Sequence, residues 1–387
     1  MKPEREVGAR LRDAAVPDAD AARARARRVV LAAAAERAAA PRRARRPTLA
    51  LAAAAVAALA LAGALATPPG EAVGHWVREL IRLERPLPPP RPALTELPAA
   101  GRLLVTGPAG AWVVQRDGSR RRLGPYRDAA WSPRGLFVAV TRDRQLLAVE
   151  PGGAVRWALA RPAPVADPRW SSDGYRIAYR TRGALRVVAG DGSGDRPLVE
   201  AVAAVPAAWR PGAAHELAVV RAGGALELWA PDRGRRLWRR ARGPGTPVAL
   251  AWTPDGRRLV EVRPDAISVF GRRGRLLRRV PLRRPALAAA LSPDGRRLAV
   301  AGDRGVELRR LRDLRRGRPL LPVRASGGLA WAPAGHHLLV AAGGADQWVF
   351  LPVGRSGRVV ASGGIARQFD PSRPRPRGFP RVEGWAP

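Results

Sequence analysis

Trp252-Thr-Pro-Asp-Gly256 and Leu291-Ser-Pro-Asp-Gly295 are two copies of a short phrase that occurs six times beyond residue 130. The other four copies are Trp131-Ser-Pro-Arg-Gly135, Trp170-Ser-Ser-Asp-Gly174, Trp209-Arg-Pro-Gly212 and Trp331-Ala-Pro-Ala-Gly335. Their first residues lie 39, 39, 43, 39 and 40 positions apart. A period of about 40 residues, with a turn and short alternating segments in each unit, is typical of a β-propeller. We therefore expect an all-β fold, a propeller, over residues 101–387.

One unit shows how the phrase works. Leu287–Leu291 reads as an inner strand with small residues at its centre, and Arg297–Ala301 reads as the strand that follows it. Between them, Pro293 presets its backbone angle φ, Asp294 can hydrogen-bond the local backbone, and Gly295 accepts a positive φ. Beyond the second strand, apolar and polar residues alternate as in a half-buried strand. The unit therefore predicts one blade.

The two ends of the repeat region are incomplete. Gly101–Thr106 resembles a second strand, but no phrase precedes it. At the far end, Trp385 supplies the start of a phrase with only two residues after it. We predict that the C-terminal strand completes the blade that begins at residue 101, which would leave no open edge and give seven blades. If Trp385 belongs to a tail, six blades remain.

We assign the residues of the phrase a structural role. A tryptophan at the start would pack between neighbouring blades, because a blade cannot bury both faces alone. The proline, aspartate and glycine would form the turn. The residues with this predicted role are Trp131, Pro133, Trp170, Asp173, Gly174, Trp209, Trp252, Pro254, Asp255, Gly256, Pro293, Asp294, Gly295, Trp331, Pro333 and Trp385.

Residues 1–100 divide into three segments. Residues 1–46 form an Ala/Arg-rich arm, residues 47–67 a predicted transmembrane helix, and residues 68–100 a predicted juxtamembrane helix followed by a proline-rich linker. The 19 uncharged residues Thr48–Ala66 are long enough to span a bilayer as a helix. Arginines cluster before this stretch, so the positive-inside rule places the arm in the cytoplasm and the propeller outside. A soluble alanine-rich helix and a cleaved export signal are the two competing interpretations.

The chain is strongly basic. It holds 69 basic and 32 acidic residues, Lys2 is the only lysine, and residues 101–387 alone carry a net charge of +30. One interpretation is a surface that attracts anionic lipids or acidic envelope polymers. The other is a solvated surface whose arginines are spread over every blade because of a compositional bias and bind no particular ligand. Nucleic acid is disfavoured, because most tryptophans fall at core-like positions of the repeat rather than among the arginines. The absence of cysteine excludes disulfides and thiolate chemistry.

No catalytic motif stands out, and we expect a protein that is not an enzyme and that binds no cofactor or metal. GxSxG, P-loop, GxGxxG and HExxH patterns are lacking. His336 and His337 read as a surface pair rather than as metal ligands. Asp191–Asp195 has the oxygen spacing of a calcium loop, but it stands where a hairpin belongs and lacks a distal glutamate.

Trp252–Leu259 and Ser292–Ala299 resemble the phrase Trp-Ser-Pro-Asp-Gly-Arg-x-Leu-Ala of TolB-like, WD-repeat-like propellers. The whole layout resembles single-pass, propeller-bearing membrane proteins of high-GC actinobacteria. The resemblance implies a monomeric scaffold at the bacterial cell membrane that binds a protein or an anionic envelope component. Similar N-terminal arms on anti-sigma-type regulators imply an alternative, a regulator whose arm binds a sigma-type or signalling factor. A propeller enzyme with a site not visible in the sequence is a further alternative.

Overall fold

The computed structural model describes residues 94–387, except 213, 242, 244, 355–356 and 372–375. The arm and the predicted transmembrane helix lie outside the described residues. Within the described residues, no helix is both long enough and apolar enough to cross a bilayer.

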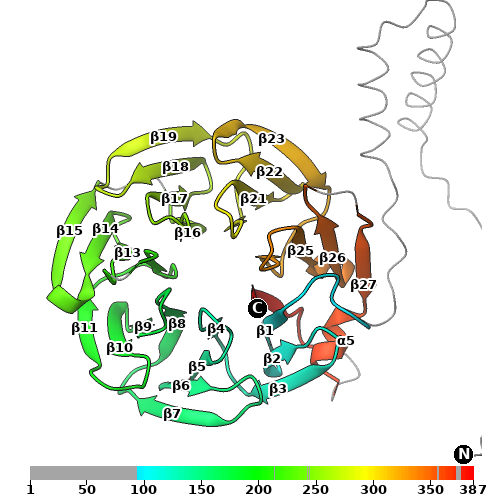
Figure 1. Ribbon diagram of the computed structural model, residues 1–387, viewed down its shortest axis with the longest axis horizontal. Helices are drawn as coiled ribbons and strands as arrows, with labels where there is room; N and C mark the ends of the chain where they lie inside the picture. The colour runs from blue at the N-terminus through cyan, green and yellow to red at the C-terminus, as the bar shows by residue number, and fades with distance from the viewer. Residues whose placement is uncertain (1–93, 213, 242, 244, 355–356, 372–375) are drawn as a thin grey trace, which may run out of the picture. The chain divides into compact units, whose positions relative to one another are not determined.

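The described chain is a β-propeller of seven four-stranded antiparallel sheets, arranged in a ring about a central axis (Figure 1). Blade 1 contains β28 (Arg381–Ala386), β1 (Arg102–Gly107), β2 (Gly110–Val114) and β3 (Arg120–Gly124). Blade 2 contains β4 (Ala129–Trp131), β5 (Val138–Arg142), β6 (Gln145–Val149) and β7 (Val155–Ala160). Blade 3 contains β8 (Val165–Trp170), β9 (Arg176–Thr181), β10 (Ala184–Ala189) and β11 (Arg196–Val199).

The remaining blades follow in chain order. Blade 4 contains β12 (Ala208–Trp209), β13 (Leu217–Val220), β14 (Leu226–Ala230) and β15 (Arg235–Arg240), with the short 3-10 helix η1 (Pro231–Arg233). Blade 5 contains β16 (Ala249–Trp252), β17 (Arg258–Val262), β18 (Ala266–Gly271) and β19 (Leu276–Pro281). Blade 6 contains β20 (Ala288–Leu291), β21 (Arg297–Gly302), β22 (Gly305–Arg310) and β23 (Asp313–Leu321). Blade 7 contains β24 (Leu329–Trp331), β25 (His337–Ala342), β26 (Gln347–Pro352) and β27 (Val360–Gly363). The short 3-10 helix η2 (Gly343–Ala345) lies between β25 and β26, and the helix α5 (Ile365–Phe369) follows the blade.

The ring closes through the C-terminal strand. β28 pairs antiparallel with β1, with Leu103 opposite Trp385, and becomes the innermost strand of blade 1. Figure 1 shows the end of the chain beside β1 near the centre of the ring. This confirms the predicted seven blades, and it removes the six-bladed alternative, because Trp385 lies in a paired strand rather than in a tail.

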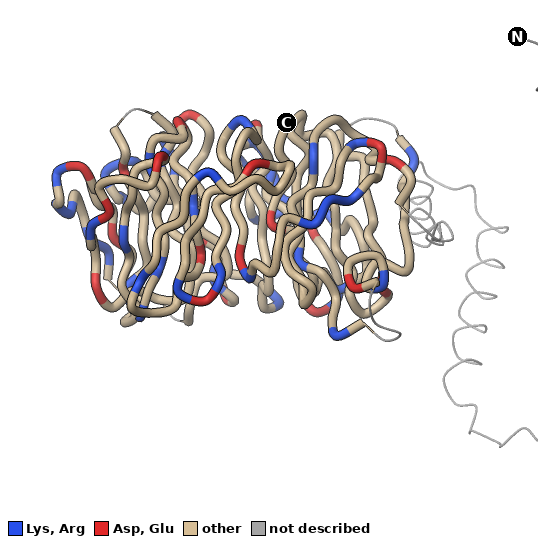
Figure 2. The backbone as a smooth tube through the Cα atoms, turned by 90° about the horizontal axis from the view of Figure 1, so that it is seen from below, with Lys and Arg blue, Asp and Glu red and all other residues tan. Residues whose placement is uncertain are grey.

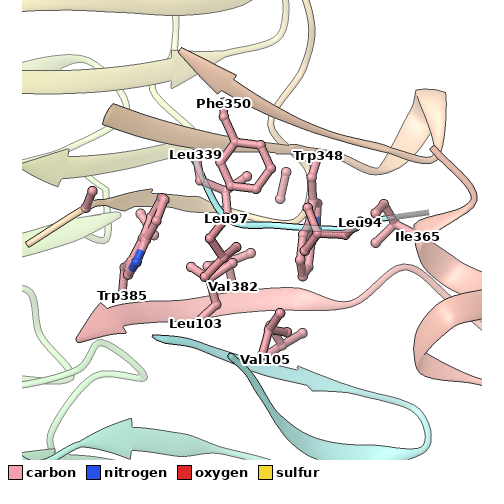
Figure 3. Close-up of a cluster of buried hydrophobic side chains, with 14 of the residues drawn as sticks. Leu94, Leu97, Leu103, Val105, Leu339, Trp348, Phe350, Ile365, Val382 and Trp385 are labelled. Atoms are coloured by element: carbon pink, nitrogen blue, oxygen red, sulfur yellow. The ribbon is translucent and has the colours of Figure 1, made fainter. Parts of the chain in front are cut away.

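The hydrophobic core consists of layers between successive blades. The cluster between blades 7 and 1 contains Trp348 and Phe350 of β26 together with Leu103 and Trp385 (Figure 3). Each of the other six clusters likewise joins side chains of two neighbouring blades, from blades 1 and 2 round to blades 6 and 7. Burial of apolar area between blades, rather than within one, therefore stabilises the ring.

The blade-7 core also takes in residues that precede the first strand. Leu94 and Leu97 are buried in the same cluster as Trp348 and Phe350. Leu97 donates a backbone hydrogen bond of 2.8 Å to the carbonyl oxygen of Arg116. The packed body of the propeller therefore begins at or before Leu94, a few residues upstream of β1.

Turns lie at two edges of the ring. In a four-stranded antiparallel sheet, the turn between the first two strands and the turn between the last two lie at the same edge. The repeated phrase forms the first of these turns in blades 2 to 7, so we call this edge the motif face. Figure 2 shows charged residues of both signs at the two edges of the ring and further basic residues along strands between the edges.

Candidate functional site

In blades 3, 5 and 6, the turn of the motif face holds the arginine that begins the next strand in a defined position. In blade 6, the Ser292 hydroxyl donates to Asp294 Oδ1 at 2.5 Å and accepts the backbone N–H of Arg297 at 2.9 Å. The backbone N–H of Arg296 donates to the same Asp294 oxygen at 3.0 Å. Burial alone would raise the pKa of Asp294, but these hydrogen bonds and the nearby arginine charges outweigh it and hold the pKa below its ordinary value.

The same hydrogen bonds make three arginines structurally equivalent. Thr253 Oγ1 accepts the backbone N–H of Arg258 in blade 5 at 3.1 Å, and Ser171 Oγ accepts that of Arg176 in blade 3 at 2.9 Å. Arg176, Arg258 and Arg297 are therefore the first residues of β9, β17 and β21. Their side chains can be compared directly.

In blade 3, the arginine at this position forms an ion pair across the seam between two blades. Arg176 Nε lies 3.0 Å from Asp232 Oδ1 in the outer turn of blade 4. Asp232 is the second residue after the third strand of its blade, β14. The seam between blades 3 and 4 is thus held by opposite charges.

In blade 5, the equivalent arginine faces another arginine. The second residue after β22 in blade 6 is Arg312, so an arginine occupies the place of Asp232. Arg258 and Arg312 line the same cleft, of about 520 Å³, between blades 5 and 6. At this seam, two arginines occupy the positions that Arg176 and Asp232 occupy between blades 3 and 4.

The cleft is lined almost entirely by arginine. Among the described residues, its walls are formed by Arg258, Gly295, Arg296, Arg297, Arg310, Leu311 and Arg312, and none of these is acidic. We call this the arginine cleft. Arg297 and Arg310 are directly opposite each other in the register of β21 and β22. Like charges directly opposite on antiparallel strands are destabilising, so the fold tolerates an electrostatic cost here.

Few acids neutralise the cleft. The guanidinium groups of Arg258, Arg296, Arg310 and Arg312 form no hydrogen bond or ion pair with any described residue. The nearest carboxylate in the turn, Asp294, already accepts two hydrogen bonds. Asp313 lies 3.9 Å from Arg316, on the outer strand. Asp255 and Asp294 interact with the charges of Arg258, Arg296 and Arg297 and offset part of them, but the cleft keeps an excess of positive charge.

The surrounding chain is also the most basic part of the propeller. Residues 233–318, from β15 through most of β23, hold 25 arginines and 7 acidic residues, a net charge of +18. The whole of residues 101–387 carries +30. More than half of the charge thus lies on three successive blades, and it is less evenly spread than the repeat pattern had indicated.

The central channel has a different character. A hollow of about 400 Å³ on the inner strands of blades 3 to 6 is lined mainly by alanine and tryptophan, with Arg169 as the charged residue among its described walls. Its walls include Ala207, Ala208, Ala249, Ala251 and Ala289. Small apolar side chains of this kind offer no group for acid–base chemistry.

The segment Asp191–Asp195, considered as a calcium candidate, forms other contacts. Asp191 accepts hydrogen bonds from the backbone and hydroxyl of Ser193 in its own turn. Asp195 instead pairs with Arg161 and Arg186 and accepts a 2.5 Å hydrogen bond from Tyr179. Burial and the Asp195 carboxylate raise the pKa of the Tyr179 hydroxyl to about 12. Among the described residues, no group of histidine and acidic side chains is arranged to hold a metal.

The tryptophans of the phrase lie between blades. The indole N–H of Trp209 donates to the carbonyl of Arg169 at 2.9 Å, that of Trp252 to Ala208 at 3.2 Å, and that of Trp331 to Ala290 at 2.9 Å. Each acceptor is the residue just before the phrase of the preceding blade. Trp131, whose Cδ1 is 3.5 Å from where a Cβ on Gly384 would lie, touches blade 1, and Trp385 packs against Phe350.

The prolines, aspartates and glycines of the phrase form the turns. In blades 2, 3, 5, 6 and 7, the backbone N–H of the turn glycine donates to the carbonyl three residues earlier, as between Gly295 and Ser292 at 2.8 Å and between Gly335 and Ala332, around Pro333, at 2.8 Å. Pro133 and Pro293 lie against the glycine of the next turn, Gly174 and Gly335. These residues shape the edge on which the arginine cleft opens.

The residues of the arginine cleft were not singled out in the sequence. The signal present there is the doubled arginine after Asp-Gly, Arg257-Arg258 and Arg296-Arg297, together with Arg309-Arg310-Leu-Arg312. In a chain this rich in arginine such pairs are unremarkable by themselves. The structure shows that Arg312 follows β22 as Asp232 follows β14, so that it stands near Arg258 where Asp232 stands near Arg176.

The fold and the cleft together define the chain as a seven-bladed β-propeller with an arginine-lined cleft between two of its blades. No protein-family model matches the chain, and no curated protein matches it.

Proposed function

We propose that this propeller is a binding module that holds a phosphate-bearing anionic ligand in the arginine cleft. The proposal depends on one difference between two seams: an arginine stands in one at the position where an aspartate stands in the other. Arg176 meets Asp232 between blades 3 and 4, whereas Arg258 meets Arg312 between blades 5 and 6. An anion bound between Arg258 and Arg312 would supply the negative charge that the seam lacks.

The chemistry of the walls suits an oxyanion. The planar guanidinium group presents its N–H donors in a fork that matches phosphate, and such charge-assisted hydrogen bonds are stronger than neutral ones. Arg258 and Arg312 come from different blades, whereas the guanidinium group of Arg297 extends to Val353 and Gly354 of blade 7. Two arginines from facing blades favour an anion with several oxygens, such as phosphate, over a single carboxylate.

The membrane setting is part of the same proposal. The uncharged stretch Thr48–Ala66, flanked by arginines on its N-terminal side, supports a single-pass anchor with the propeller outside the cell membrane. The repeated phrase supports kinship with TolB-like, WD-repeat-like propellers, which act mainly as monomeric interaction scaffolds. An anionic component of the bacterial envelope is then the ligand to which the cleft would be exposed.

The test is a charge reversal at the seam with a matched control. In the full-length chain, Arg312→Asp would restore the type of ion pair that Arg176 and Asp232 form, and would fill the site with the protein's own carboxylate. Arg304→Asp changes the net charge equally, but Arg304 is exposed in the turn between β21 and β22, at the opposite edge. Isothermal titration with inorganic pyrophosphate at low salt measures the affinity.

We expect Arg312→Asp to lower the affinity for pyrophosphate at least roughly tenfold, the range for loss of charge-assisted hydrogen bonds. Its thermal midpoint should be unchanged or raised, because an ion pair replaces a repulsion. Arg304→Asp should bind as the unmodified chain does. Equal losses in both variants would show that the overall charge, not the cleft, attracts the anion, and the proposed site would then be wrong.

A further inference from the structure

We propose that the ligand of the arginine cleft is a lipid phosphate, a phosphate group carried on a hydrocarbon chain. This inference rests on the proposed function and goes further by naming the rest of the ligand. It comes from a second, partly apolar hollow that joins the first.

The second hollow, of about 260 Å³, lies beside the arginine cleft. Its described walls are Arg258, Val269, Leu277, Arg278, Leu311 and Arg312. Arg258, Leu311 and Arg312 also line the arginine cleft, so the two hollows are adjacent and share a wall. Cationic groups at one end and aliphatic groups at the other make a site with two different ends.

Leu277 supplies the exposed part of the apolar end. It lies near the start of β19 and is 46% exposed, whereas its neighbour Leu276 lines neither hollow, because successive strand residues point to opposite faces. Arg278, the next residue, donates from Nη1 to the carbonyl oxygen of Arg312 at 2.6 Å, which ties this strand to the turn that carries the charge. The apolar and cationic parts of the surface are therefore held next to each other.

An amphiphile uses both parts at once. A free phosphate group would engage the arginines but leave Leu277, which is 46% exposed, in water. A hydrocarbon chain attached to the phosphate would cover the Leu277 side chain, and burial of apolar surface is favourable in proportion to its area. The uncharged stretch Thr48–Ala66 would keep the propeller close to a lipid surface if it spans the bilayer, as we expect.

The test compares the two ends of the ligand separately. The full-length chain, purified in a neutral detergent, is titrated calorimetrically with methyl phosphate, hexyl phosphate and hexyl glucoside. We expect hexyl phosphate to bind roughly tenfold or more tightly than methyl phosphate, as the burial of about two methylene groups would give. Hexyl glucoside, which has the chain without the charge, should not bind measurably.

Two leucine variants locate the apolar contact. Leu277→Ser should abolish the advantage of hexyl phosphate while leaving the affinity for methyl phosphate unchanged. Leu287→Ser is the matched control, because Leu287 is 45% exposed but lies before β20, outside both hollows. This variant should behave as the unmodified chain does. Arg312→Asp should weaken the binding of both phosphates.

The outcomes separate this inference from the proposed function. Equal affinities for methyl and hexyl phosphate, with no effect of Leu277→Ser, would overturn the lipid assignment and leave a phosphate-binding cleft. Failure of both phosphates to bind would overturn the inference and the proposed function together. A phosphoserine peptide that bound more tightly than hexyl phosphate would overturn the lipid assignment in favour of a protein partner.

Discussion

At the scale of single residues, the motif face depends on glycines that let neighbouring turns touch. Gly295 has a φ of +66°, and a Cβ built on it would lie 2.6 Å from Cδ of Pro254 in the turn of the preceding blade. A similar close approach occurs between Gly256 and the carbonyl oxygen of Pro211, at 2.8 Å. The glycine is therefore required for two reasons, its backbone conformation and the close approach of the next turn.

Gly295→Ala should therefore lower the free energy of unfolding by about 2 kcal/mol or more, from the strained left-handed backbone and from the clash with Pro254. Gly183→Ala separates the two causes. Gly183 has a similar φ of +74°, but nothing lies within 4 Å of the added Cβ. Denaturant titration of both variants measures the difference. Equal losses would mean that the turns of blades 5 and 6 do not pack as described.

At the scale of elements, the seams between blades differ in how their charges are paired. Between blades 3 and 4, His215 lies between two carboxylates, with Nε2 at 2.6 Å from Asp173 and Nδ1 at 2.6 Å from Asp232. Carboxylates only accept, so both contacts are hydrogen bonds when both ring nitrogens carry a proton. His215 also has a φ of +44°, uncommon for a residue with a side chain, and its turn is one residue longer than those of its neighbours.

The His215 contact should make this seam sensitive to acid. For Asp173 and Asp232, burial would raise the pKa, but hydrogen bonds from His215 and other donors outweigh it and hold both pKa values below the ordinary value of 3.8. Carboxylates with a lowered pKa contribute stability that is fully present above that ordinary value and is lost as pH falls through the folded-state pKa.

His215→Ala should therefore lower the free energy of unfolding near pH 6 by about 1 kcal/mol, because these charge-assisted hydrogen bonds are partly exposed and screened by solvent. The difference from the unmodified chain should shrink in acid, once the two aspartates are protonated. Unfolding curves recorded from pH 6 to pH 2 give both values. A difference that did not change with pH would show that His215 contributes packing against Trp209 rather than its contacts with the aspartates.

At the scale of the whole molecule, closure of the ring and the distribution of charge act together. β28 pairs with β1, so blade 1 draws its strands from both ends of the described chain and all seven interblade layers are filled. A closed ring holds each seam at a fixed width. The seam between blades 5 and 6 can therefore keep Arg258 and Arg312 near each other although they repel, because the neighbouring blades leave it no room to open.

Much of this architecture could be predicted from the sequence, because each blade is built from local signals. Turn residues such as Pro254 and Gly256 act within their own segment, and the partial units at residue 101 and at Trp385 indicate closure. The arginine cleft could not be predicted. Its meaning depends on which turn residue of one blade meets which strand residue of another, and that requires the register of β17, β21 and β22.

The charge of the propeller shows the same limit. Composition gives a net of +30 for residues 101–387, but it does not distinguish a compositional bias from a binding surface. The arrangement of the arginines carries the missing information. Arg176, Arg180 and Arg210 are each paired with a carboxylate, whereas five arginines of the cleft line one hollow that has no acidic residue in its described walls.

An experimental structure of the full-length protein with pyrophosphate tests the central claim most directly. The account predicts density for the anion between Arg258 and Arg312, with guanidinium nitrogens within about 3 Å of its oxygens, the distance for charge-assisted hydrogen bonds. Density for the anion elsewhere on the ring, or a seam in which Arg258 and Arg312 turn away from each other and leave no space between them, would contradict it.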